Sequence, residues 1–91
     1  MKTGGVQLNL VLTYHWYDEY EAGNKRIEYR VMSENWRRKI WERRDEISSV
    51  RFQRGYTKTA SVYAVQDIDV GPCPYDGWDD EYYRIYVSEG E

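Results

Sequence analysis

The sequence predicts a small α+β fold, in which about five strands form a strongly bent sheet or partly closed β-barrel with two short helices. Two observations carry this prediction. Apolar and polar residues alternate with period two, which is typical of strands, over residues 6–12, 27–32, 47–54, 67–70 and 82–87, and residues 60–65 form a strand with apolar residues on both faces. Aromatic residues recur at helical spacing over 13–22 and 33–44 instead. The last three strands are joined by turns or a short loop, so we expect them to pair antiparallel.

Capping and turn residues support the order of these elements. Thr13 is expected to cap the first helix through its hydroxyl, and Gly23 ends that helix because glycine accepts the left-handed conformation. Ser33 is expected to cap the second helix. The strand beginning at Ala60 has apolar residues on both faces, which indicates a central position in the sheet. Residues 71–78 are expected to form a loop that ends the strand pairing and folds its aromatic side chains back onto the barrel mouth.

Length and composition set the outer limits. A chain of 91 residues has room for a single domain, residues 1–91, with a thin core rich in Tyr and Trp. The first residues lack the pattern of a signal peptide, and no run of about 20 apolar residues is present, so we expect a cytoplasmic protein. The single Cys73 excludes an internal disulfide and a multi-cysteine metal site, and His15 has no partner at ligand spacing. We expect no metal and no cofactor.

Charge is distributed unevenly along the chain. Residues 25–58 carry 11 basic and 5 acidic side chains, whereas residues 59–91 carry 1 basic and 8 acidic ones. A local basic face bordered by acidic loops suits a nucleotide or a short or single-stranded nucleic acid better than a long duplex. Equally, the two halves can pair in the fold and cancel each other's charge.

Two groups of residues are candidates for a binding site. Lys25, Glu28 and Arg30 place cations and a carboxylate together at the start of a strand, which can form either a small polar site or an exposed strand face with a surface ion pair. In the second group an aromatic residue lies between cations on the turn after the third strand, an arrangement suited to stacking an unpaired base and holding its phosphate. This group consists of Arg54, Tyr56 and Lys58. The two groups could share one mouth of the barrel.

The segment Gly23-x-Lys25-x-Ile27-Glu28-x-Arg30 resembles the G-x-K-T-x-E-x-R signature of ASCH domains, in the PUA-like superfamily. The order of later segments is similar to short ASCH-like proteins carried by phages or mobile elements. These segments are Asn35–Lys39 with its Trp and basic residues, Phe52–Tyr56 with its Gly-Tyr turn, and the late Gly77-Trp78 and Tyr82-Tyr83 pairs. The resemblance implies a PUA-like β-barrel with flanking helices and a cleft that binds RNA or modified bases.

In relatives that hydrolyse N4-acetylcytidine, the signature lysine is catalytic and works with a threonine three residues later. Lys25 matches that lysine, but Glu28 stands at the threonine position, and Arg26 replaces the threonine that usually follows the lysine. We therefore expect a binding module for RNA or a modified nucleotide. The expected ligand-binding residues are Lys25, Glu28, Arg30, Trp36, Arg54, Tyr56 and Lys58.

Two other functions remain open. One is a small hydrolase of N4-acylated cytidine or RNA, an amidohydrolase or ribonuclease with Lys25 and Glu28 as catalytic residues. The other is a protein-interaction module of a phage or mobile element that binds its partner through the Pro72–Trp78 loop, since exposed Tyr and Trp anchor protein interfaces.

Overall fold

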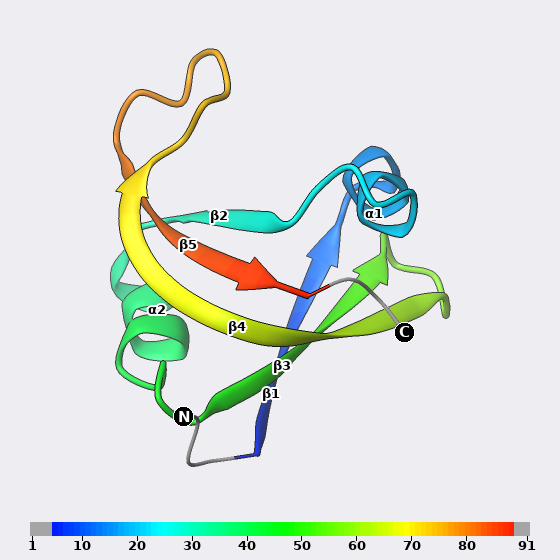
Figure 1. Ribbon diagram of the computed structural model, residues 1–91, viewed down its shortest axis with the longest axis horizontal. Helices are drawn as coiled ribbons and strands as arrows, with labels where there is room; N and C mark the ends of the chain where they lie inside the picture. Colours follow the sequence, from blue (N-terminus) through cyan, green and yellow to red (C-terminus); the bar gives the residue numbers. More distant parts are fainter. Residues whose placement is uncertain (1–4, 89–91) are drawn as a thin grey trace.

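The computed structural model describes residues 5–88, and Figure 1 shows a sheet that curls around its own core. The predicted α+β class, with a curled sheet of five strands and two short helices, is confirmed, and the sheet is mixed. In chain order the elements are β1 (Val6–Leu12), α1 (Tyr14–Glu21), β2 (Ile27–Val31), α2 (Glu34–Trp36) with the π-helical turn η1 (Arg37–Trp41), β3 (Ile47–Arg54), β4 (Ala60–Pro72) and β5 (Glu81–Val87).

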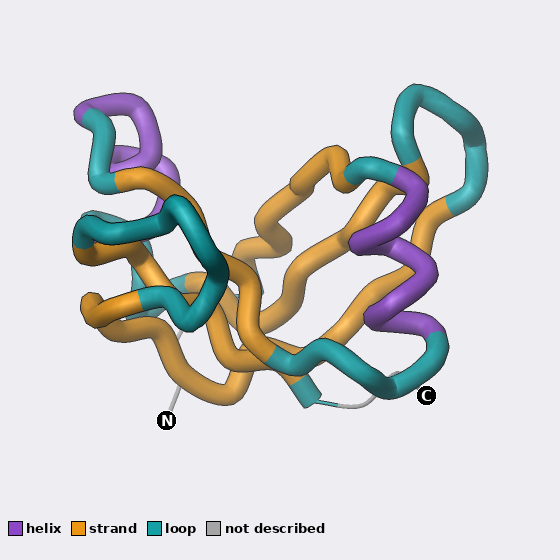
Figure 2. Tube along the Cα trace, turned by 90° about the horizontal axis from the view of Figure 1, so that it is seen from above, coloured by secondary structure: helices purple, strands orange, loops and turns teal. Residues whose placement is uncertain are grey.

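The sheet has the strand order β1-β3-β4-β5-β2, so β1 and β2 are its two edges. The β1–β3 pair is parallel, and the other three pairs are antiparallel. Because the sheet curls, the two edge strands approach each other across an opening rather than lying at opposite ends of a flat layer (Figures 1 and 2). The molecule is therefore a half-barrel with an open seam between β1 and β2.

Strand β4 makes most of the curl. Its first half pairs with β3 and its second half pairs with β5, and the register slips by one residue at Gln66, which forms a β-bulge. The prediction that pairing stops before Gly71 is wrong, because Gly71 pairs with Tyr82 and Pro72 with Glu81. The missing N–H of proline is tolerated here because β3 does not extend along this half of β4. Gly71 also leaves room for the Arg84 guanidinium, which a Cβ atom would strike.

The core fills the concave side of the sheet. Its most deeply buried side chains are aliphatic apart from one phenylalanine: Leu10, Ile40, Ile47, Val50, Phe52 and Ile85. Tyrosines join this core, as predicted, whereas Trp16, Trp36 and Trp41 pack only partly buried against its margin. These half-buried tryptophans leave part of their ring surface exposed at the edge of the core.

Both helices differ in detail from the prediction. Thr13 occupies the N-cap position of α1, but its hydroxyl makes no capping hydrogen bond. Gly23 ends this helix with a φ of 82°, as predicted. Ser33 caps α2 by accepting from the Trp36 N–H at 3.2 Å, yet the α-helix lasts one turn and continues as η1, which buries Ile40 completely.

Three arginines of this second helical segment and of the turn after it pair with neighbouring glutamates. Arg37 forms ion pairs with Glu34 and Glu42, and Arg43 lies 3.6 Å from Glu46. The acidic C-terminal third pairs with its own arginine instead, since Arg84 binds Asp69. The predicted basic face is thus balanced largely by neighbouring glutamates. No helix in the described part of the chain is long and apolar enough to cross a membrane.

Candidate functional site

Strand β2 turns its charged side chains toward the inside of the half-barrel. Glu28 lies opposite Ile85 and Arg30 opposite Tyr83, and both of these partners on β5 are core residues. Glu28 is only 5% exposed, so the interpretation of this pattern as a solvent-exposed strand face is wrong. A carboxylate that shares a face with the core is costly unless its charge is compensated.

Three neighbours compensate the Glu28 carboxylate. Its Oε1 atom accepts from the Tyr20 hydroxyl at 2.8 Å and from Lys25 Nζ at 3.2 Å, and its Oε2 atom accepts from Arg30 Nη2 at 2.7 Å. Burial and the neighbouring Glu28 charge both raise the pKa of Tyr20, so its hydroxyl stays protonated and remains a donor. Two cations against one carboxylate leave this buried cluster with one excess positive charge.

The Lys25 ammonium lies in a box of aromatic rings. Its Nζ atom is 4.2 Å from the Trp16 ring centroid, and the centroids of Tyr20, Tyr75 and Tyr29 lie 5.2, 5.4 and 6.0 Å away. Rings at these distances attract a cation through their quadrupoles. Tyr75 comes from the β4–β5 loop and stacks on Trp16 at 5.2 Å. The predicted return of the loop aromatics onto the barrel mouth is therefore confirmed.

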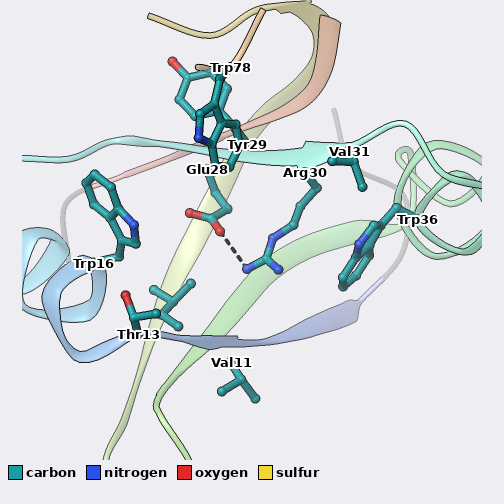
Figure 3. Close-up of a pocket in the computed structure, with 10 residues that line it drawn as sticks. Val11, Thr13, Trp16, Glu28, Tyr29, Arg30, Val31, Trp36 and Trp78 are labelled. Carbon is teal, nitrogen blue, oxygen red and sulfur yellow. Dashed lines mark hydrogen bonds and ion pairs between the residues drawn. The ribbon is translucent and has the colours of Figure 1, made fainter. Parts of the chain in front are cut away.

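A cavity of about 320 Å³ opens at the seam between β1 and β2. Figure 3 shows Glu28 and Arg30 between the two strands, with Trp16 and Trp36 at opposite sides. The cavity is lined by residues of β1 and its end, of β2, and by three tryptophans: Val11, Leu12, Thr13, Trp16, Glu28, Tyr29, Arg30, Val31, Trp36 and Trp78. The seam that lacks a strand pair is thus occupied by side chains that combine aromatic surface with hydrogen-bonding charge.

Arg30 links the charged cluster to this aromatic lining. Its guanidinium carbon lies 5.2 Å from the Trp36 ring centroid while its Nη2 binds Glu28. Its Nε–H is buried and has no hydrogen-bond partner in the described part of the chain. Buried donors are rarely left without an acceptor, and such exceptions occur at functional sites.

The structure brings together four of the predicted site residues, Lys25, Glu28, Arg30 and Trp36. The second predicted group, on the β3–β4 turn, does not line the cavity. There the Arg54 guanidinium binds both carboxylate oxygens of Asp18, at 3.0 and 3.1 Å, and lowers the pKa of that carboxyl. Tyr56 is 92% exposed, and Lys58 is exposed as well.

Several residues of the site were not predicted as site residues. Trp16 and Tyr20 are four residues apart on α1, a spacing that places both on one side of a helix and close to the motif that follows. That spacing could have predicted that both rings lie beside Lys25 and Glu28. Thr13 and Trp78 join the cavity only through the tertiary fold.

The described residues contain no group of three or more His, Cys, Asp or Glu side chains that could hold a metal ion. Comparisons of the chain with protein-family models, with curated proteins and with solved structures found no match.

Proposed function

We propose that the chain is an ASCH-like domain of the PUA-like superfamily that binds RNA or a nucleotide-like ligand in the cavity between β1 and β2. The observation that carries this proposal is the buried Lys25–Glu28–Arg30 cluster, because its Glu28 and Arg30 side chains line a cavity together with three tryptophans, while Lys25 binds Glu28 from outside that lining. The resemblance of Gly23–Arg30 to the ASCH signature and the curled sheet with two helices support the same proposal.

Charge favours an anionic ligand. The side chains of Glu28, Lys25 and Arg30 are 7%, 9% and 20% exposed, so water screens their charges poorly. A phosphate near Arg30 would offset the excess positive charge of the Lys25–Glu28–Arg30 cluster. It would also supply the acceptor that the Arg30 Nε–H lacks in the described part of the chain.

Ring surface favours a planar ligand. Trp16, Trp36 and Trp78 line the same cavity, and an unpaired base stacks on aromatic rings regardless of its identity. Glu28 Oε2 accepts one hydrogen bond within the protein and can accept another from an exocyclic amine of the base. Arg30 would bind phosphate or a ring acceptor, whereas Lys25 would act as a positioning residue that holds Glu28.

One observation favours hydrolysis as a second candidate function. Lys25 Nζ lies 3.2 Å from Glu28 Oε1, within reach for proton transfer in a hydrolase of acylated cytidine or RNA. Release of acetate from N4-acetylcytidine, or cleavage of RNA, would establish this activity if it is lost in Lys25→Ala. The protein-interaction function finds less support, because the ring of Tyr75 packs against Trp16 and Tyr29 rather than outward.

The proposal is tested by thermal shift and by tryptophan-fluorescence titration against nucleotides, modified nucleosides and short RNA. A ligand at 100 times its dissociation constant adds about 2.7 kcal/mol of stability, which raises the melting temperature of a domain this small by about 10 °C or more. Trp36→Ala and Arg30→Gln should each weaken binding at least tenfold. Arg43→Gln removes a charge from an exposed residue outside the cavity lining and should leave affinity unchanged.

Two results would refute the proposal. One is the absence of any stabilising ligand across the panel, with a stoichiometric protein partner recovered instead. The other is a ligand whose affinity survives both Trp36→Ala and Arg30→Gln, since its site would then lie outside the cavity.

A further inference from the structure

A second hollow adjoins the first on the other side of the charged cluster. It has a volume of about 240 Å³ and is lined by the residues that lead into β2 together with two tyrosines: Asn24, Lys25, Arg26, Ile27, Tyr29 and Tyr75.

Side chains that line the two hollows are in contact and form a shared wall between them. Tyr29 lines both of them. Lys25 of the small hollow touches Glu28 of the large one at 3.2 Å, and Tyr75 of the small hollow stacks on Trp16 of the large one at 5.2 Å. A ligand that fills both hollows would therefore cross a wall formed by the Lys25–Glu28 ion pair and the stacked rings of Tyr75 and Trp16.

The small hollow repeats the chemistry of the large one. The large cavity combines Arg30 with a tryptophan ring. The small hollow is lined by the rings of Tyr29 and Tyr75 and by two cations, of which Lys25 binds Glu28 and Arg26 donates to the Lys25 carbonyl oxygen at 3.1 Å. A cation beside an aromatic ring is the arrangement that accommodates one nucleotide, with the base stacked and the phosphate contacted. Two such arrangements side by side match a ligand of two linked nucleotides.

The wall between the hollows lies at an edge of the sheet. Strand β2 is hydrogen-bonded to β5 on one side only, and the larger cavity opens on its other side. A phosphodiester link can cross this edge without displacing a strand pair in the described part of the chain. Lys25 lies two residues before the start of β2, where it lines the small hollow while its ammonium contacts Glu28 in the wall, so it lies beside the crossing point.

We infer that the ligand of this site is a phosphodiester-linked dinucleotide unit, with one nucleotide in each hollow. This inference rests on the proposed function and specifies the length of the ligand. The unit can be a free dinucleotide or two successive nucleotides within a longer single strand.

The test compares affinities for a mononucleotide, the matching dinucleotide and a five-nucleotide RNA that contains the same step at its centre, all by fluorescence titration. The dinucleotide should bind the native chain at least about fivefold more tightly than the mononucleotide, since one additional stacked base contributes about fivefold to a hundredfold. Arg26→Gln should reduce this ratio. Ile27→Trp, which places a bulky ring at the lining of the small hollow, should reduce it to about one, and Arg43→Gln should leave it unchanged.

The outcomes separate this inference from the proposed function. If none of the three ligands binds, the proposed function fails. If the mononucleotide binds and the dinucleotide gains nothing, or if the gain survives both Arg26→Gln and Ile27→Trp, the two-nucleotide site is overturned while the proposed function stands. If the gain is present and lost in the variants, binding of the five-nucleotide RNA as tight as the dinucleotide indicates a strand as the source. Binding of the dinucleotide alone indicates a free dinucleotide.

Discussion

Replacing Glu28 with Gln tests the charged cluster most directly. The change keeps the shape of the side chain but removes the negative charge that Lys25 and Arg30 share. Removing one partner of a buried ion pair costs about 3–5 kcal/mol, because the remaining charge is left uncompensated in a poorly solvated position. Arg30 is partly exposed, so we expect Glu28→Gln to lower the free energy of unfolding by about 3 kcal/mol, the lower end of that range.

Urea unfolding followed by tryptophan fluorescence measures this loss. With a slope of about 1–3 kcal/mol per molar urea, the midpoint should fall by at least about 1 M, and the melting temperature by more than about 10 °C. Adding Lys25→Met removes one of the stranded cations, so the double variant should be more stable than the sum of the single changes predicts. Glu34→Gln is the matched control, because Glu34 is 58% exposed, water screens its ion pairs, and its loss should leave the urea midpoint nearly unchanged. A loss below 1 kcal/mol in Glu28→Gln, at unchanged slope, would refute the reasoning.

Two further predictions concern stability away from the cluster. The Arg84 guanidinium holds the pKa of the Asp69 carboxyl below its usual range. This pair therefore stabilises the fold fully above the carboxyl's unfolded pKa of about 4, and the contribution is lost as the pH falls further. Asp69→Asn should flatten the fall in melting temperature between about pH 5 and pH 2, and an unaltered profile would contradict the assignment. Gly55 has a φ of 57°, and a Cβ atom there would lie 2.5 Å from the Tyr14 ring, so Gly55→Ala should lose about 1–3 kcal/mol in the same urea assay, whereas a neutral change would show that the turn relaxes freely.

Much of the architecture was predictable because it depends on local patterns. Alternation located all five strands, and apolar residues on both faces placed β4 at the centre of the sheet, where the structure has it. The π-helical turn was not predictable, because burial of Ile40 against the core decides it rather than any local preference. The extension of β4 through Pro72 likewise depends on which neighbouring strand is present along that half.

The site was predictable in its residues but not in its orientation. Alternation separates Glu28 and Arg30 from Tyr29, yet it cannot tell which of the two faces lies inside. Pairing with Ile85 on β5 settles this, and only the tertiary register supplies that pairing. The β3–β4 turn has an aromatic residue between cations, which predicted a second part of the site. This prediction could not foresee that Asp18, which is distant in the sequence, binds the Arg54 guanidinium.

The bulge at Gln66 has a consequence for how such a domain can diversify. Strand β4 is the element through which backbone hydrogen bonds join the β1–β3 pair to the β5–β2 pair, so its bend sets the distance between the two edge strands. Gln66 is exposed and does not line the cavity. Insertions, deletions or substitutions at this remote position can therefore widen or narrow the opening between β1 and β2 while the side chains that line the cavity stay the same. The size of the cavity is in this way set by backbone geometry, separately from the side chains that line it.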